Sequence, residues 1–251
     1  MKLVVLGSGI PLSGGNRACA GYLVESHGQF IVLDLGTGSF LNLKKIVQPS
    51  KVNALFFSHY CHADHVADLT GFLQHRRMFC TQNQGEAKQL DIFGPKGTKE
   101  FVNKNLELFP SFLESKFPIS VEEMEYDAKR VFGFSIKAKP VKHAENSIGF
   151  RVEAEGKAIA YSGDTEYCDA VIDLGKDADL LVLQCSYPVG IKHEGHLNAQ
   201  ECGEIAKKAN AKKLLLTHFF PEAEKEDLKK QAAKAFGGEI MLAKDLLEVQ
   251  I

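Results

Sequence analysis

Short apolar runs separated by glycine-rich turns dominate the first third of the chain. Three of them, at Leu3–Leu6, Ala20–Glu25 and Gln29–Asp34, have the length and side-chain types of β-strands. In Phe40–Val47 the apolar residues change to helical spacing. The pattern therefore predicts that the chain begins with adjacent strands and continues into a helix.

The rest of the chain alternates between predicted strands and predicted helices. The strands are Ala54–Ser58, Asp91–Pro95 with its turn, several within residues 117–141, Gly149–Ala154, Lys157–Ser162, Leu180–Gln184, Lys213–Thr217, Ile240–Ala243 and Leu246–Ile251. The helices are Val66–Arg77, Lys99–Leu108, Ala199–Ala209 and Lys225–Ala235. Because strands occur at both ends of the sequence with helices between them, we predict one α/β domain over residues 1–251. It would contain two sheets with helices outside.

Composition and charge describe an ordinary globular protein. The chain has 251 residues, of which 45% are hydrophobic and 25% charged, and its formal net charge is −2. A domain that binds nucleic acid through its overall charge is expected to be strongly basic, so this balance gives no support to such binding. The densest basic group near the motifs below is Gln74–Arg77, which we interpret as a solvated helix face.

The sequence contains neither a membrane span nor an export signal by pattern. No apolar run approaches the roughly 20 residues that a spanning helix needs, and the apolar N-terminal run ends at Gly7. The six cysteines are scattered and form no CxxC pair. We therefore expect free thiols and a cytoplasmic protein.

Three histidines crowd into seven positions beside an aspartate, at His59, His62, Asp64 and His65. Imidazole nitrogens and carboxylates are the ligands that zinc, manganese and iron take in proteins. The segment follows an apolar strand and precedes a predicted helix, which is where α/β proteins place their chemistry. The pattern therefore predicts a metal site in this loop.

Three further strands also end in candidate ligands. His143 follows Ile136–Val141, Asp164 follows Lys157–Ser162, and His218 follows Lys213–Thr217. Polar side chains buried at strand ends need partners, and a shared pair of metal ions would supply them. The other histidines have milder interpretations: His75 and His193 are expected to be solvated, and His27 to lie in a turn.

The motifs together resemble those of the metallo-β-lactamase-fold superfamily, in particular its branch of ribonuclease Z and small phosphodiesterase-like hydrolases. The matching segments are Leu6–Pro11, Leu33–Gly38, Ser58–His65, Val66–Gly71, Ile92–Pro95, His143, Ser162–Thr165, Leu181–Tyr187 with Gly195–Leu197, and Leu216–Phe219. The resemblance implies a four-layer αββα sandwich with two mixed sheets. It also implies two divalent metal ions, with zinc first and Mn²⁺ or Fe²⁺ as alternatives, and it is compatible with a homodimer.

The resemblance also implies a role for each motif residue. One metal would take His59, His62 and His143, and the other Asp64, His65 and His218, with Asp164 bridging the two. Asp64 would also orient or deprotonate the nucleophile, whereas His196 would contact the substrate phosphate or protonate the leaving group. His196 has an alternative interpretation as the cap of the helix that begins near Asn198. Asp34 and Asp68 are candidates for holding the ligand histidines in place.

One residue too many separates the first two histidines of the motif. The family pattern spaces them by one residue, whereas Tyr60 and Cys61 both lie between His59 and His62. Either the loop bulges and His59 still reaches the metal, or Tyr60 takes the first ligand position, or Cys61 acts as a thiolate ligand. A one-residue shift on an extended chain reverses the face of a side chain, so the loop must absorb the extra residue for His59 to reach the metal. We favour the bulge.

The expected activity is hydrolysis of a small phosphodiester or nucleotide. Structured RNA is a less favoured substrate, because residues 105–125 are acidic at Glu107, Glu114, Glu122, Glu123 and Glu125 and would repel a polynucleotide. An alternative enzyme would use the same site on a lactone or thioester. A non-enzymatic alternative is a degenerate protein that only binds metal or a nucleotide.

Overall fold

The computed structural model describes residues 1–13, 17–83, 88–109, 117–126 and 128–251. Within these residues the strands form two seven-stranded sheets that face one another. The order of the first sheet is β14-β1-β2-β3-β4-β5-β6, and that of the second is β13-β12-β11-β10-β9-β8-β7. Both sheets are mixed, since each has an antiparallel half and a parallel half.

The strands closely follow the apolar runs of the sequence. The first sheet contains β1 (Lys2–Gly7), β2 (Gly21–Ser26), β3 (Gln29–Leu35), β4 (Ala54–Phe56), β5 (Leu90–Gly94), β6 (Ile119–Glu123) and β14 (Glu248–Gln250). The second contains β7 (Lys129–Val131), β8 (Phe134–Pro140), β9 (Ile148–Ala154), β10 (Lys157–Tyr161), β11 (Leu180–Gln184), β12 (Lys213–Thr217) and β13 (Glu239–Leu242). The two ends of the chain are joined because β1 pairs with β14.

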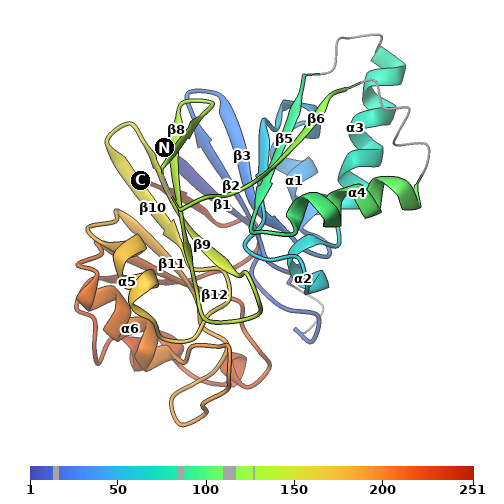
Figure 1. Cartoon of the computed structure of the whole chain (residues 1–251). Helices are drawn as coiled ribbons and strands as arrows, with labels where there is room; N and C mark the ends of the chain where they lie inside the picture. The colour runs from blue at the N-terminus through green and yellow to red at the C-terminus, as the bar shows by residue number, and fades with distance from the viewer. Residues whose placement is uncertain (14–16, 84–87, 110–116, 127) are drawn as a thin grey trace.

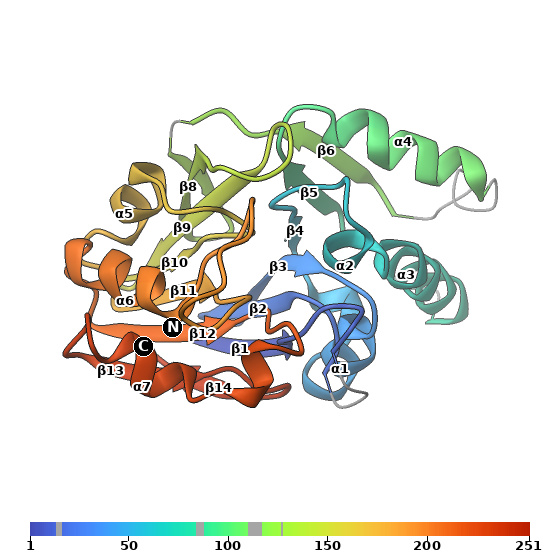
Figure 2. The same ribbon diagram turned by 90° about the horizontal axis from the view of Figure 1, so that it is seen from below.

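Helices cover the outer face of each sheet, so the layers follow the order helix, sheet, sheet, helix (Figures 1 and 2). The first sheet carries α1 (Ser39–Ile46), α2 (Ala63–Val66), α3 (Leu69–Asn83) and α4 (Thr98–Leu108), and the second α5 (Asp169–Gly175), α6 (Ala199–Lys208) and α7 (Leu228–Ala232). Short 3-10 turns occupy Pro49–Lys51 and Ala223–Lys225. Among the described residues, no helix is both long and apolar enough to cross a bilayer.

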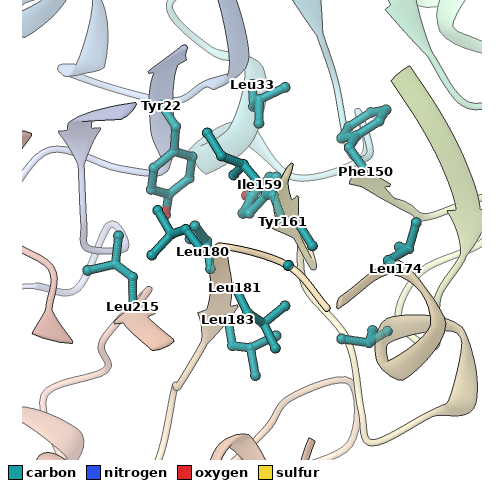
Figure 3. Close-up of a cluster of buried hydrophobic side chains, with 14 of the residues drawn as sticks. Tyr22, Leu33, Phe150, Ile159, Tyr161, Leu174, Leu180, Leu181, Leu183 and Leu215 are labelled. Atoms are coloured by element: carbon teal, nitrogen blue, oxygen red, sulfur yellow. The ribbon is translucent and has the colours of Figure 1, made fainter. Parts of the chain in front are cut away.

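Each central strand buries both of its faces, which explains the continuous apolar runs. Along β3, Ile31 and Leu33 point into the layer between the sheets, whereas Val32 and Leu35 point toward the helices. Figure 3 shows the inter-sheet layer, in which Leu33 of the first sheet lies near Ile159 of the second. The central strands are therefore packed on both faces.

The predicted helix Val66–Arg77 begins and ends at other residues. The structure has a short turn, α2, at Ala63–Val66 and a longer α3 at Leu69–Asn83. Asp68 lies between them and accepts a hydrogen bond from the Phe40 N–H at 2.9 Å, which ties this break to the first turn of α1. Among the hydrogen bonds of the described residues, Asp68 has none to a histidine of the site, so the prediction that it holds one was wrong.

The predicted helix Lys225–Ala235 is shorter in the structure. It is preceded by the 3-10 turn, and α7 proper covers only Leu228–Ala232. Asp227 caps α7 by accepting a hydrogen bond from the Lys230 N–H at 2.9 Å. A capping aspartate at this point places the beginning of the helix later than the periodicity alone suggested.

The interpretation of Gln74–Arg77 as a solvated face was wrong for Arg76. Its side chain is only 1% exposed. The guanidinium donates hydrogen bonds to the carbonyl oxygens of Pro49, Val52 and Lys88 at 2.8–2.9 Å. A fork of N–H donors can satisfy several carbonyls at once, which is why an arginine is tolerated in the interior here.

Candidate metal centre

The structure brings together all eight histidines and aspartates that the sequence placed in the site. Two groups of potential ligand atoms, each with its atoms within 4.8 Å of one another, are His59, His62, His143 and Asp164, and Asp64, His65 and His218. A third, overlapping group contains Asp164, His196 and His218. The residues come from α2 and from the loops that follow β4, β8, β10, β11 and β12, so both sheets contribute.

The loop after β4 turns His59 toward the centre and Tyr60 away from it. His59 is 1% exposed, and its Nε2 lies 3.1 Å from the Nδ1 of His62. The Tyr60 ring instead stacks on Phe101 of α4, with the ring centroids 5.5 Å apart. Cys61 is exposed and belongs to neither group. Among the three hypotheses for the extra residue, this geometry favours the bulge.

Three imidazole nitrogens of the first group face one another, and they do not carry enough protons for every contact to be a hydrogen bond. The Nδ1 of His62 lies 3.1 Å from the Nε2 of His59 and 3.1 Å from the Nε2 of His143. A neutral imidazole nitrogen carries one proton at most, so it cannot satisfy both neighbours. Nitrogens bound tetrahedrally to one zinc ion, at about 2.0–2.1 Å each, are separated by roughly 3.3 Å. The spacing therefore fits one shared cation.

The second group is gathered around two carboxylates. The Nε2 atoms of His65 and His218 each lie 3.3 Å from Oδ2 of Asp164, and His218 Nε2 lies 3.4 Å from Oδ2 of Asp64. His65 Nε2 and Asp164 Oδ1 are buried and have no hydrogen-bond partner within the part of the chain that the structure describes. Leaving such atoms unpaired is costly. A cation at this point would pair them, and Asp164 is close enough to both groups to serve each.

Asp34 orients His65 by contacting the ring nitrogen that faces away from the centre. This fully buried carboxylate accepts hydrogen bonds from Ser58 N–H, Ser58 O–H and Tyr161 O–H, each at 2.7 Å, and its Oδ2 lies 2.8 Å from His65 Nδ1. An ionised carboxylate only accepts, so Nδ1 of His65 donates and Nε2 is left free to face the centre. The structure thus places Asp34 in the supporting role expected of it.

Backbone and hydroxyl oxygens orient two other histidines in the same way. His143 Nδ1 donates to the carbonyl oxygen of Gly195 at 3.0 Å, and His218 Nδ1 lies 3.2 Å from Ser186 Oγ. Both rings then present Nε2 to the carboxylates. His218 also has a left-handed backbone conformation, with φ at 61°. Such conformations are uncommon outside glycine and cluster at functional sites.

Burial and charge set the protonation of the carboxylates. Burial alone would raise the pKa of Asp64, but its hydrogen bond to His218 and the charge of His65 lower the pKa to about 2. Burial opposes ionisation of Asp164 as well, yet the charges of His218 and His65 hold its pKa well below the usual value. Burial and the charge of His65 lower the pKa of His59 well below its usual value. Anionic carboxylates beside a neutral His59 are the protonation states that bind cations.

His196 lies at the edge of the cluster and does not cap the next helix. Asn198 performs that task, because its side chain accepts from the N–H groups of Gln200 and Glu201. The ring of His196 lies 5.1 Å from that of His143. Burial lowers the pKa of His196 to about 4.

Sequence reasoning missed Gln184 and Ser186, which hold His196. Gln184 is 1% exposed, donates to the carbonyl oxygen of Thr165 at 2.6 Å and presents Oε1 to Nδ1 of His196 at 3.2 Å. Ser186 Oγ donates to Gln184 Oε1 and lies 3.3 Å from His196 Nδ1. The signal in the sequence was the two polar residues, Gln184 and Ser186, that follow the apolar run of β11. A buried side-chain amide at such a position needs several hydrogen-bond partners.

Comparisons with known proteins agree with this geometry. A family model described as a beta-lactamase superfamily domain matches residues 30–219. The probable metallo-hydrolase YhfI of Bacillus subtilis is 28% identical, and the alignment covers 97% of each protein. A crystal structure of YhfI, described as a metallo-beta-lactamase fold protein, superposes with a TM-score of 0.86 at 27% identity and covers 99% of this chain and 98% of that chain. The predicted αββα fold is thereby confirmed.

Other similar proteins are named for action on phosphorus compounds. The ribonuclease Z of Ignicoccus hospitalis is 28% identical over 93% of this chain and 92% of its own length. The human short-form tRNase Z has a TM-score of 0.79 at 24% identity, covering 100% of this chain and 99% of that chain. A diphosphatase of the PhnP family has a TM-score of 0.76 at 21% identity, covering 100% and 97%. These last two likenesses concern the fold alone.

Proposed function

This chain is a metallo-hydrolase of the beta-lactamase superfamily related to ribonuclease Z, and from that premise we propose that it is a two-metal phosphodiesterase. We propose a small phosphodiester or a nucleotide as its substrate, and a single catalytic domain over residues 1–251. The observation that carries the proposal is the pair of ligand groups that meet at Asp164, where buried His65 Nε2 and Asp164 Oδ1 have no hydrogen-bond partner among the described residues.

The proposed ligands divide between the two cations as the two groups do. One would be held by His59, His62 and His143, the other by Asp64, His65 and His218, and Asp164 would serve both. Imidazole with carboxylate suits zinc first, with Mn²⁺ or Fe²⁺ as alternatives. When bound, such cations supply Lewis-acid chemistry, which makes water nucleophilic near neutral pH and offsets charge at phosphorus.

The protein's own groups would then handle the proton and the orientation of substrate. Asp64 is anionic and its side chain is 16% exposed, so it can orient the attacking water and accept its proton. His196 reaches the edge of the cluster, where it can contact the phosphate. A phosphate beside its ring would raise the low pKa of His196 by adding negative charge. Under that condition His196 can hold a proton for the leaving oxygen.

The similarity to ribonuclease Z supports a bond to phosphorus as the reacting bond. The relative from Ignicoccus hospitalis is a ribonuclease, and cleaving RNA means hydrolysing a phosphodiester. We keep structured RNA as the less favoured substrate of this chain. In the acidic stretch, residues 105–125, Glu122 forms an ion pair with Lys129, and Glu123 accepts a hydrogen bond from the Gly97 N–H. Glu114 lies outside the described residues.

Substrate panels and one substitution test the proposal. Protein loaded with zinc or manganese should hydrolyse bis(4-nitrophenyl) phosphate, and Asp64→Ala should abolish hydrolysis while the chain stays folded. The matched control is Asp173→Ala, which removes an aspartate whose side chain is 58% exposed on α5 and should leave the rate unchanged. A clearly higher kcat/KM on lactones or thioesters, or full activity of Asp64→Ala, would refute it. Well under one metal per chain without turnover would favour a binding protein instead.

A further inference from the structure

The loop between β11 and α6 is closed at its base and stands beside the metal centre. The Ser186 N–H donates to the carbonyl oxygen of Leu197 at 3.1 Å, and the Ala199 N–H donates to that of Tyr187 at 3.1 Å. Tyr187 and Asn198 also form a β-bridge. Residues 188–197 therefore form a loop with a rigid neck, and the position of its residues relative to the centre is defined.

The same loop is tied directly to a proposed ligand. The carbonyl oxygen of Gly195 accepts from His143, and the Gly195 N–H donates to Glu166 Oε1 at 3.0 Å. Gly195 has φ at +80°, and a Cβ at this position would lie 2.6 Å from Nδ1 of His143. Only glycine allows so close an approach. The loop is thus held against the centre by hydrogen bonds of both the N–H and the carbonyl oxygen of Gly195.

Aromatic rings continue from the metal cluster out along this loop. Phe220 lies 6.0 Å from the His218 ring and 4.9 Å from the Tyr187 ring, measured between centroids. The His193 ring stacks on Tyr187 at 5.4 Å with only 21° between the planes, and it lies 5.7 Å from the His196 ring. His193 is therefore one ring further out from the cluster than His196.

The outer end of this row of rings is open to solvent. Tyr187 is 8% exposed and supports one face of His193, which is itself exposed as the sequence led us to expect. Two apolar side chains of the same loop are also exposed, Val189 at 41% and Ile191 at 39%. Exposed apolar groups beside a polar site often mark the place where a ligand rests.

We propose that His193, backed by Tyr187, is a stacking platform for the nucleobase of a nucleotide whose phosphate lies at the metal centre. The inference rests on the proposed function, since the phosphate must be held by the two-metal site. A flat, supported ring with one open face suits a planar base, and every base offers such a face. Val189 and Ile191 would shield the edge of the stacked base from water. The enzyme would then prefer nucleotides over phosphodiesters with aliphatic substituents.

Two ligands that differ only in the base test this proposal. Adenosine 5′-monophosphate and ribose 5-phosphate share the phosphate and the sugar, and their Kd values for the metal-loaded protein can be measured by calorimetry. We expect the nucleotide to bind at least about tenfold more tightly, as base stacking on an aromatic ring allows. The ratio should fall to near unity in His193→Ala and should be restored in His193→Phe. His27→Ala, which removes a histidine with an 81% exposed side chain in the β2–β3 turn, should leave the ratio unchanged.

Equal affinities for the two ligands in the unmodified protein would overturn the inference, and so would a ratio that His193→Ala does not change. The outcome is independent of the proposed hydrolysis. Protein that cleaves bis(4-nitrophenyl) phosphate but does not discriminate the base retains the function and loses the platform. Protein that discriminates the base but cleaves no phosphodiester retains the platform and loses the function.

Discussion

At the scale of single residues, the extra residue in the histidine motif is accommodated because the Tyr60 side chain packs against α4 instead of the metal centre. Its ring stacks on Phe101, and its hydroxyl donates to the carbonyl oxygen of Lys96 at 3.3 Å. A Cβ on Gly97 would lie 1.9 Å from the Tyr60 hydroxyl oxygen, so the glycine makes room for the ring. With Tyr60 held on α4, His59 is left to face the centre.

This arrangement predicts unequal effects at the two neighbouring positions. His59→Ala should lower the metal content per chain and the hydrolysis rate, because it removes a nitrogen of the first group. Tyr60→Phe should change neither, because the stack on Phe101 remains. Metal analysis and the visible absorption of the Co²⁺-substituted protein measure the difference. Equal loss of metal in both variants would contradict the bulge.

Asp34 offers a second test at this scale. Asp34→Asn keeps the shape but turns an N–H₂ group toward donors at Ser58, Tyr161 or His65, so the tautomer of His65 is no longer enforced. Loss of such a support typically costs about 10- to 100-fold in metal affinity. Competition with a chelator of known affinity would measure it. Unchanged affinity would mean that His65 is oriented by its packing alone.

At the scale of elements, periodicity located most strands and helices but not the breaks that side-chain contacts impose. The helix expected over Val66–Arg77 is divided because Asp68 bonds to the beginning of α1. Arg76 was misplaced for a related reason. Its charge suggested the surface, yet three carbonyl oxygens from other segments accept its protons inside. The hydrogen-bond partners of Asp68 and of Arg76 are distant in the chain, so the spacing of apolar residues around either position does not reveal them.

Arg76 should therefore be a stability determinant of α3. Arg76→Met leaves the carbonyls of Pro49, Val52 and Lys88 without their donors, and we expect the free energy of unfolding to fall by about 2–4 kcal/mol. The neighbouring Arg77→Met, at a half-buried position, should change it by roughly 0.5 kcal/mol or less. Urea denaturation of both variants provides the comparison. Similar losses at the two positions would argue against the buried network.

At the scale of the whole molecule, the proposed site joins the two sheets. The segment from His59 to His65, which ends within α2, follows β4 of the first sheet, whereas His143, Asp164 and His218 follow strands of the second. A cation held by ligands from both sheets binds only the folded arrangement. Metal binding should consequently contribute to the stability of the sandwich.

Removal of metal should lower the thermal stability of the protein. Free metal at about 100 times its Kd contributes roughly 2.7 kcal/mol to the folded state, so a chelator should lower the Tm by several degrees. The same chelator should have a smaller effect on His218→Ala, which lacks a ligand of the second group but keeps the first group. A Tm that does not respond to the chelator in the unmodified protein would show that metal does not link the sheets.

The sequence by itself determined the elements of the two sheets and the segments that carry the chemistry, because burial on both faces leaves continuous apolar runs and because ligand residues follow directly at their ends. It could not decide between His59 and Tyr60, since a shift of one residue reverses the face. Only the tertiary structure settled which ring turns inward, through the contact of Tyr60 with Phe101 on another element. The supporting roles of Gln184 and Ser186 were likewise decided by folding, because a buried polar group takes its function from partners that are distant in the chain.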